Sequence, residues 1–175
     1  MSRATFLDRD GVINRKAPEG EYVTCWEEMQ FLPGVHEAIT LLNRAGFRVI
    51  VVSNQRGVAK GLMTAAELEA IHRRMCQALA ADGATIDAIY YCPHDTQPAC
   101  DCRKPAPGML IAAARTYELN LAASWMVGDS DTDEAAGRNA GCRTVLIAPD
   151  AAVRTADVVA PSLLDAVHQI LRLES

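Results

Sequence analysis

The chain has 175 residues, of which 50% are hydrophobic and only 5% are aromatic, and its formal net charge is −5. This composition predicts one domain over residues 1–175 with an aliphatic core, and it excludes a disordered chain. The basic residues are scattered, so we expect the chain to bind a small molecule and neither nucleic acid nor a membrane. We also expect a monomer. No stretch reaches the roughly 18 apolar residues of a membrane span, and no signal peptide is evident, so we expect a cytoplasmic protein.

The first half of the chain alternates between strands and helices. Unbroken apolar or β-branched runs are typical of strands buried on both faces, and capping residues mark the ends of the helices between them. The elements expected here are, in chain order, a strand at 4–7, a surface loop at 12–32, a helix from Pro33-Gly34 to Gly46, a strand at 48–52 and a long helix from the Thr64/Glu67 capping box to Gly83.

The second half continues the same alternation. Its expected elements are a strand at 86–91, a helix from Pro107 to about Leu119, a strand at 124–127, a short helix around 135–140, a strand at 144–147, an edge strand at 157–159 and a last helix capped by Ser162. Strands that alternate with helices form parallel sheets with right-handed crossovers. The sequence therefore predicts an α/β fold with a doubly wound, mostly parallel sheet, and it leaves no insertion long enough for a large cap domain.

Polar residues follow the predicted strands at their carboxyl ends, where ligands bind in open parallel sheets. Carboxylates that converge there suit Mg²⁺, and a lysine with a hydroxyl group could bind a phosphate beside the ion. Alone, an Asp-x-Asp-Gly segment is more often a calcium-type turn or a surface loop, so the interpretation rests on the whole set. The residues expected to meet at this edge are Asp8, Asp10, Ser53, Lys104, Asp129 and Asp133.

These motifs resemble those of the haloacid dehalogenase superfamily of aspartyl phosphatases, in the same order and spacing. Within that superfamily, the branch with the most similar motifs contains D-glycero-D-manno-heptose 1,7-bisphosphate 7-phosphatases and histidinol phosphatases. The segments that carry the narrower resemblance are Phe6-Leu7-Asp8-Arg9-Asp10-Gly11, Ser53-Asn54-Gln55, Cys92-Pro93-His94 and Cys100-Asp101-Cys102-Arg103-Lys104-Pro105.

The resemblance implies a role for each motif residue. Asp8 would be the nucleophile that forms an aspartyl-phosphate, and Asp10 the acid and base of the two half-reactions. Mg²⁺ would be bound by the Asp8 and Asp129 carboxylates and the Asp10 backbone carbonyl. Ser53 and Lys104 would hold the transferring phosphoryl group.

Substrate choice is expected to depend on side chains around these groups. Asp133 would orient Lys104 or a metal-bound water, and Ser130 stands where the branch pattern has Lys, a difference that bears on substrate choice. Without a cap, specificity must come from the loops that bear Lys16, Glu19 and Tyr22 together with residues beside the motifs. The substrate-binding candidates in the motifs are Arg9, Asn54, Gln55, Arg56 and Arg103.

Four metal-ligand residues lie close together in one predicted loop: Cys92, His94, Cys100 and Cys102. In a reducing compartment this set is typical of a closed structural Zn²⁺ site, and the resemblance also implies zinc. The other cysteines and histidines are expected to be surface or packing residues without ligand roles: Cys25, Cys76, Cys142, His36, His72 and His168.

The expected activity is therefore Mg²⁺-dependent hydrolysis of a sugar phosphate. By resemblance, the favoured substrate is the 7-phosphate of D-glycero-D-manno-heptose 1,7-bisphosphate, in the synthesis of nucleotide-activated heptose for lipopolysaccharide. The first alternative is a histidinol-phosphate phosphatase. The second is a binding module that zinc stabilises and whose acidic pocket is not catalytic, which the intact Asp8, Asp10, Lys104 and Asp129 argue against.

Overall fold

A computed structural model of the chain describes residues 2–148 and 155–174. Within these residues, six strands form one sheet in which every neighbouring pair is parallel. The strands are β1 (Ala4–Leu7), β2 (Arg48–Asn54), β3 (Ala88–Cys92), β4 (Trp125–Gly128), β5 (Arg143–Ile147) and β6 (Val158–Ala160). Their order across the sheet is β3-β2-β1-β4-β5-β6, so β1 lies near the centre.

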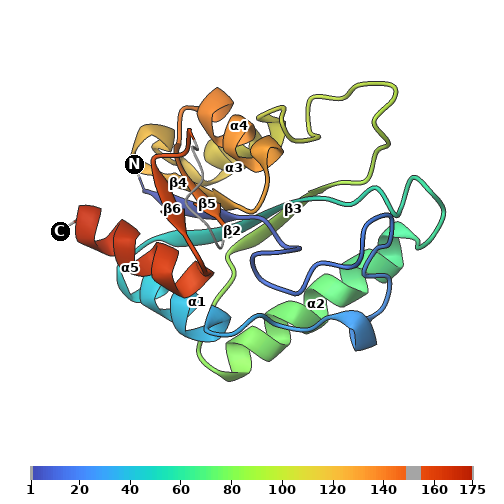
Figure 1. Cartoon of the computed structure of the whole chain (residues 1–175), viewed down its shortest axis with the longest axis horizontal. Helices are drawn as coiled ribbons and strands as arrows, with labels where there is room; N and C mark the ends of the chain where they lie inside the picture. Colours follow the sequence, from blue (N-terminus) through green and yellow to red (C-terminus); the bar gives the residue numbers. More distant parts are fainter. Residues whose placement is uncertain (1, 149–154, 175) are drawn as a thin grey trace.

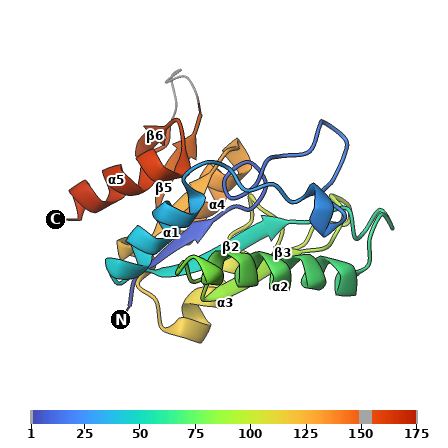
Figure 2. The same cartoon turned by 90° about the horizontal axis from the view of Figure 1, so that it is seen from below.

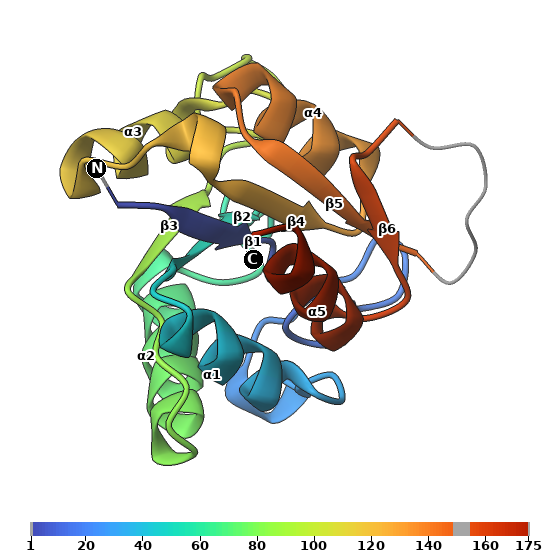
Figure 3. The ribbon, with the colours of Figure 1, turned by 90° about the vertical axis from the view of Figure 1, so that its left-hand side faces the viewer.

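Helices cover both faces of the sheet and make a three-layer molecule (Figure 3). The helices are α1 (Val35–Arg44), α2 (Ala65–Ala81), α3 (Gly108–Tyr117), α4 (Asp131–Ala140) and α5 (Leu163–Leu173), with short 3-10 helices η1 (Trp26–Glu28) and η2 (Leu121–Ala123). One layer holds α1, α2 and α5, and the other holds α3 and α4 (Figure 3).

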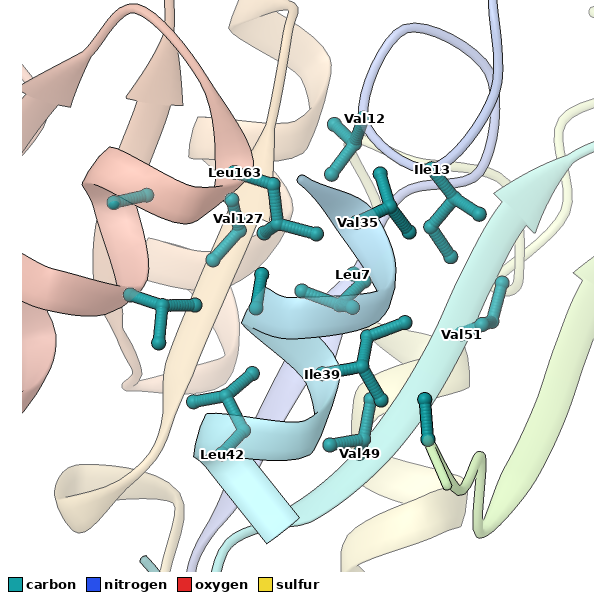
Figure 4. Packing of buried hydrophobic residues seen from close by; sticks show 14 of the residues in the cluster. Leu7, Val12, Ile13, Val35, Ile39, Leu42, Val49, Val51, Val127 and Leu163 are labelled. Carbon is teal, nitrogen blue, oxygen red and sulfur yellow. The ribbon is translucent and has the colours of Figure 1, made fainter. Parts of the chain in front are cut away.

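The alternation of side chains along β1 and β2 builds the two cores. Leu7, Val49 and Val51 pack with Ile39 of α1 in one core (Figure 4). Their chain neighbours, among them Phe6, point to the opposite face and pack with α3 and α4. Because both faces are buried, these strands read as unbroken apolar runs in the sequence.

The chain changes direction at β1, and this positions the site. The path from β1 through β2 to β3 moves toward one edge, whereas β4 to β6 lie on the other side of β1. The segments that follow β1, β2 and β3 gather at one end of the molecule (Figure 1). Among them, residues 12–32 extend beyond the strand ends and return to α1 (Figure 2). A crevice is expected where the strand order reverses.

The predicted α/β class and parallel sheet are confirmed, with small differences at element ends. Helix α4 begins at Asp131, earlier than the apolar spacing indicated, because the Ser130 side chain and Asp133 form a capping box at its start. No large cap domain interrupts the described ranges. No helix in those ranges is long and apolar enough to cross a membrane. The monomeric state and cytoplasmic location stay predictions.

Candidate active site

A cavity of about 380 Å³ opens at the carboxyl ends of the strands. Residues 16–23, part of the loop after β1, form one wall, and strand-end side chains form the floor. The predicted site residues that line it are Asp8, Asp10, Asn54, Gln55, Arg103, Lys104, Asp129, Ser130 and Asp133. The structure thus brings together side chains that are up to 125 positions apart in the chain, from Asp8 to Asp133.

Lys104 is buried between two carboxylates. Its Nζ lies 2.7 Å from Asp8 Oδ1 and 2.6 Å from Asp133 Oδ1, and it donates to the Val52 carbonyl at 2.8 Å. Burial acts to lower the pKa of Lys104, but the two carboxylates outweigh it and raise that pKa. Burial raises the pKa of Asp8 to about 7, against the pull of Lys104. The site therefore keeps a permanent cation beside the Asp8 carboxyl group.

Asp133 acts as a scaffold for this arrangement. Its Oδ2 accepts the backbone N–H groups of Asp129 and Ser130, both at 3.2 Å, and the Ser130 hydroxyl at 2.7 Å. A β-carbon at Gly128 would lie 2.0 Å from the Asp133 side chain, so only glycine allows this close approach. Both Asp133 oxygens are therefore engaged, one of them with Lys104, and its role in orienting the lysine stays a prediction.

Carboxylate oxygens of Asp8, Asp129 and Asp133 lie within 4.8 Å of one another. Asp129 Oδ1 is buried without a hydrogen-bond partner, while its Oδ2 lies 2.9 Å from the exposed Lys16 ammonium. Gly11 has a φ of +93°, and a β-carbon there would lie 2.2 Å from Asp129 Oδ2. The Asp129 carboxylate thus fits its place only beside a glycine, and its buried Oδ1 without a partner suits a hard divalent cation such as Mg²⁺. The backbone carbonyl of Asp10 stays a predicted ligand.

Asp10 is held from several directions. Arg9 Nη2 donates to both of its oxygens at 3.0 and 3.1 Å, and the Asn14 and Gln55 amides donate to one oxygen each at 2.9 Å. Burial acts to raise the pKa of Asp10, but the Arg9 charge and these hydrogen bonds outweigh it and hold the pKa below its usual value. Two aspartates two positions apart thus have pKa values shifted in opposite directions, a pattern typical of acid/base sites.

Comparison with known proteins agrees with this geometry. The family described as HAD-hydrolase-like matches residues 101–166. The D-glycero-beta-D-manno-heptose-1,7-bisphosphate 7-phosphatase of Pseudomonas aeruginosa is 42% identical over 156 residues, which cover 89% of this chain and 86% of that protein. The chain belongs to the HAD-like hydrolase family.

Two further proteins similar to this HAD-like hydrolase are named as heptose bisphosphate phosphatases. The Escherichia coli protein with the same name is 40% identical, over 96% of this chain and 87% of its own length. The second is the solved structure of D,D-heptose 1.7-bisphosphate phosphatase from B. bronchiseptica complexed with magnesium and phosphate. It superposes with a TM-score of 0.88 at 37% identity and covers 98% of this chain and 99% of that chain.

The Cys/His loop of this HAD-like hydrolase forms a compact cluster. Cys100 Sγ lies 3.6 Å from Cys92 Sγ and 3.4 Å from Cys102 Sγ, and His94 Nδ1 lies 3.5 and 3.2 Å from the Cys92 and Cys102 sulfurs. Zn–S bonds of about 2.3 Å and Zn–N bonds of about 2.0 Å place tetrahedral ligands about 3.5 to 3.8 Å apart. The four donor atoms therefore fit one Zn²⁺ ion, and all the cysteines of the described ranges are free thiols.

Three predicted site residues lie off the cavity wall. Ser53 is buried and its hydroxyl accepts from Gln55 at 2.7 Å. The Arg9 side chain is fully buried beneath the floor, so it is not placed to contact a substrate. Arg56 Nε donates to Asp95 at 2.6 Å outside the cavity.

Asn54 lines the cavity, but its amide is already engaged. It donates to the Lys104 carbonyl at 3.1 Å and accepts the Lys104 N–H at 3.0 Å. This pair of bonds holds the backbone of the lysine, which explains the Asn54 side chain without a substrate contact.

His72 was missed as a site residue because its sequence context indicates only a helix. It was expected to be a surface or packing residue without a partner, but it is buried and its Nε2 lies 3.2 Å from Arg9 Nη1. The two residues are 63 positions apart, and no spacing rule connects them.

Proposed function

We propose that this chain is a Mg²⁺-dependent phosphatase that hydrolyses the 7-phosphate of D-glycero-D-manno-heptose 1,7-bisphosphate. The observation that carries the proposal is the buried Asp8–Lys104–Asp133 arrangement beside the partnerless Asp129 oxygen. It brings together a nucleophile, a lysine that stays charged and a site for a metal cation. The two relatives named as heptose bisphosphate 7-phosphatases, at about 40% identity over most of the chain, support the choice of substrate.

The reaction follows from the positions of these groups. Asp8 attacks phosphorus and forms the aspartyl-phosphate. Because the pKa of Asp10 is low in the empty site, Asp10 takes up a proton from the bound phosphate monoanion and gives it to the departing alkoxide. Asp10 then removes a proton from the water that hydrolyses the intermediate. Lys104 is 2.7 Å from Asp8, so its charge lies beside the phosphoryl oxygens throughout. Mg²⁺ bound at Asp8 and Asp129 would neutralise further phosphoryl charge.

The second phosphate of the substrate needs a cation on the cavity wall. Within the described ranges, three cationic side chains line the cavity. Lys104 is buried in the floor, and Lys16 is paired with Asp129. The third, Arg103, is half-buried, and its Nη1 lies 3.3 Å from the His94 carbonyl. A guanidinium suits bidentate contact with phosphate. We therefore assign recognition of the distal phosphate to Arg103.

A substrate comparison tests the function and this assignment together. A charge-assisted hydrogen bond contributes about 1.5 to 3 kcal/mol, so kcat/KM should favour the heptose bisphosphate over histidinol phosphate by roughly ten- to a hundredfold. Arg103→Ala should remove most of this preference and leave hydrolysis of p-nitrophenyl phosphate nearly unchanged. Arg56→Ala is the matched control, because Arg56 lies off the cavity, and it should keep the preference. Equal or faster turnover of histidinol phosphate by the unmodified chain would refute the heptose assignment.

We also infer that the Cys/His cluster binds structural Zn²⁺. We expect one zinc per chain in protein made with zinc under reducing conditions, and mild EDTA should remove the activity but leave the zinc. Cys100→Ser should lower the free energy of unfolding by at least about 3 kcal/mol, or the Tm by about 6 to 12 °C. Cys76→Ser, at a half-buried thiol outside the cluster, is the control. Zinc-free protein with an unchanged Tm would exclude the structural site.

A further inference from the structure

Arg9 is a buried cation that the proposed reaction leaves unexplained. Its side chain is fully buried, contacts Asp10 and does not line the cavity. Nε and Nη2 donate to Asp10, and Nη1 points away from Asp10 toward His72 Nε2 at 3.2 Å. Because an arginine nitrogen that is buried without an acceptor is strongly unfavourable, the acceptor of Nη1 matters for where the whole guanidinium lies.

The ring of His72 is suited to be this acceptor. Arginine can only donate, so the contact requires Nε2 without a proton and places the ring proton on Nδ1. Burial, with a smaller contribution from the Arg9 charge and against the charge of Asp10, lowers the pKa of His72 to about 3. The ring is therefore neutral at physiological pH. Its orientation is fixed by an edge contact with Tyr91, at 5.7 Å between ring centres, and the Tyr91 hydroxyl donates to Glu69.

The guanidinium connects this ring to the acid/base group. Nη2 bonds to both oxygens of Asp10, so rotation of the Arg9 group would remove these bonds and leave only the Asn14 and Gln55 amides to hold the carboxyl group. We propose that His72 is a positioning residue that fixes Asp10 for proton transfer by holding Arg9 from the opposite side. The proposal rests on the phosphatase function above and adds a residue from α2 that does not line the cavity.

The step that depends on this chain of contacts is the departure of the alcohol. As an Asp8 oxygen forms its bond to phosphorus, the bond from phosphorus to the ester oxygen breaks, and that oxygen receives a proton from Asp10. Asp10 carries this proton only after taking it from the bound phosphate monoanion, since its pKa is low in the empty site. Asp10 becomes a carboxylate that Arg9 stabilises. Proton transfer requires close alignment, and misplacement by about 1 Å can cost roughly a hundredfold in rate. A leaving group of low pKa, such as nitrophenolate, departs without this help.

The test compares His72→Leu with His72→Gln, whose amide oxygen can accept from Arg9. The quantity measured is kcat/KM for the heptose bisphosphate and for p-nitrophenyl phosphate. It includes only the steps up to the first irreversible one, which is the departure of the alcohol. His72→Leu should lower the value for the sugar ester roughly ten- to a hundredfold and change the nitrophenyl value by less than about threefold. His72→Gln should remain within about threefold on both. His36→Gln, at a half-buried histidine on α1 that pairs with Asp82, should change neither.

Two results would overturn the proposal. The first is an equal loss on both esters, or a loss in His72→Gln as large as in His72→Leu, since either indicates a packing role alone. The second is a His72 tautomer with the proton on Nε2, which would exclude the Arg9 contact. Nitrogen NMR of the unmodified protein measures this, and we expect the proton on Nδ1 and none on Nε2. Failure of the unmodified protein to hydrolyse either ester would instead contradict the proposed function, and the NMR result would still decide the contact.

Discussion

Asp8→Asn is expected to lower kcat/KM at least a thousandfold, about 4 kcal/mol in barrier, for sugar and nitrophenyl esters alike. The amide has nearly the shape of the carboxylate but is no nucleophile toward phosphorus, and it is a poorer ligand for Mg²⁺. Equal loss on both esters distinguishes this variant from the His72 variants. Steady-state kinetics would measure the loss, and rapid-quench experiments should find no phosphorylated protein. A variant that keeps a tenth of the activity would exclude covalent catalysis by Asp8.

The same variant should not destabilise the metal-free fold. The folded-state pKa of Asp8, about 7, lies above its ordinary value of 3.8, so the charged carboxylate is unfavourable in the folded protein. Stability from Asp8 is fully present below about pH 4 and is lost as pH rises through 7. The Tm advantage of Asp8→Asn should therefore grow from pH 4 to pH 7 and then level off. Asp10→Asn is a control with the opposite expected sign. The pKa of Asp10 is lowered in the folded protein, so its charged carboxylate is stabilising and the variant should lose stability at pH 7.

Lys104→Met is expected to abolish activity and destabilise the fold together. Removal of the ammonium leaves the buried Asp8 and Asp133 carboxylates facing each other without the cation that both contact. Breaking a buried ion pair from one side costs about 3 to 5 kcal/mol, which corresponds to a drop in Tm of about 6 to 20 °C for a chain of this size. Differential scanning calorimetry without Mg²⁺ would measure the change.

A double variant separates the two effects of Lys104. Lys104→Met with Asp8→Asn should regain part of the lost Tm, because one uncompensated carboxylate is gone, but it should regain none of the activity. The exposed Lys60, which lies over the Tyr22 ring, gives the control Lys60→Met, with an expected change within about 0.5 kcal/mol. If Lys104→Met melted at the temperature of the unmodified protein, the three-group arrangement would not contribute to stability as proposed.

Local patterns predicted most of the fold and the outline of the site. The unbroken runs at β1 and β2 indicated a sheet covered on both faces, and the strand ends indicated where Asp8 and Asp129 would meet. The Cys/His spacing likewise predicted a cluster that the structure forms. These features depend on residues near one another in the chain or on the known geometry of parallel sheets, and sequence patterns record both.

Contacts between distant segments could not be predicted in the same way. The motif position of Arg9 suggested a substrate ligand, but the direction of its side chain depends on His72, which lies on a helix from another part of the chain. Arg56 likewise points to Asp95 of the Cys/His loop and away from the cavity. The direction in which a long side chain points is set by tertiary neighbours, which periodicity and capping signals do not record.

The cavity wall at residues 16–23 has a consequence for the evolution of new specificities. Glu19, Gly20 and Glu21 are exposed on this wall, whereas Asp8, just after β1, and Lys104, in the turn before α3, are buried in the floor. Exposed loops accept changes of length and sequence far more readily than buried segments. Insertions or replacements in the wall can therefore change which phosphate ester fits while the catalytic residues stay in place. A library confined to the eight positions 16–23 could yield phosphatases for new esters with the same catalytic residues.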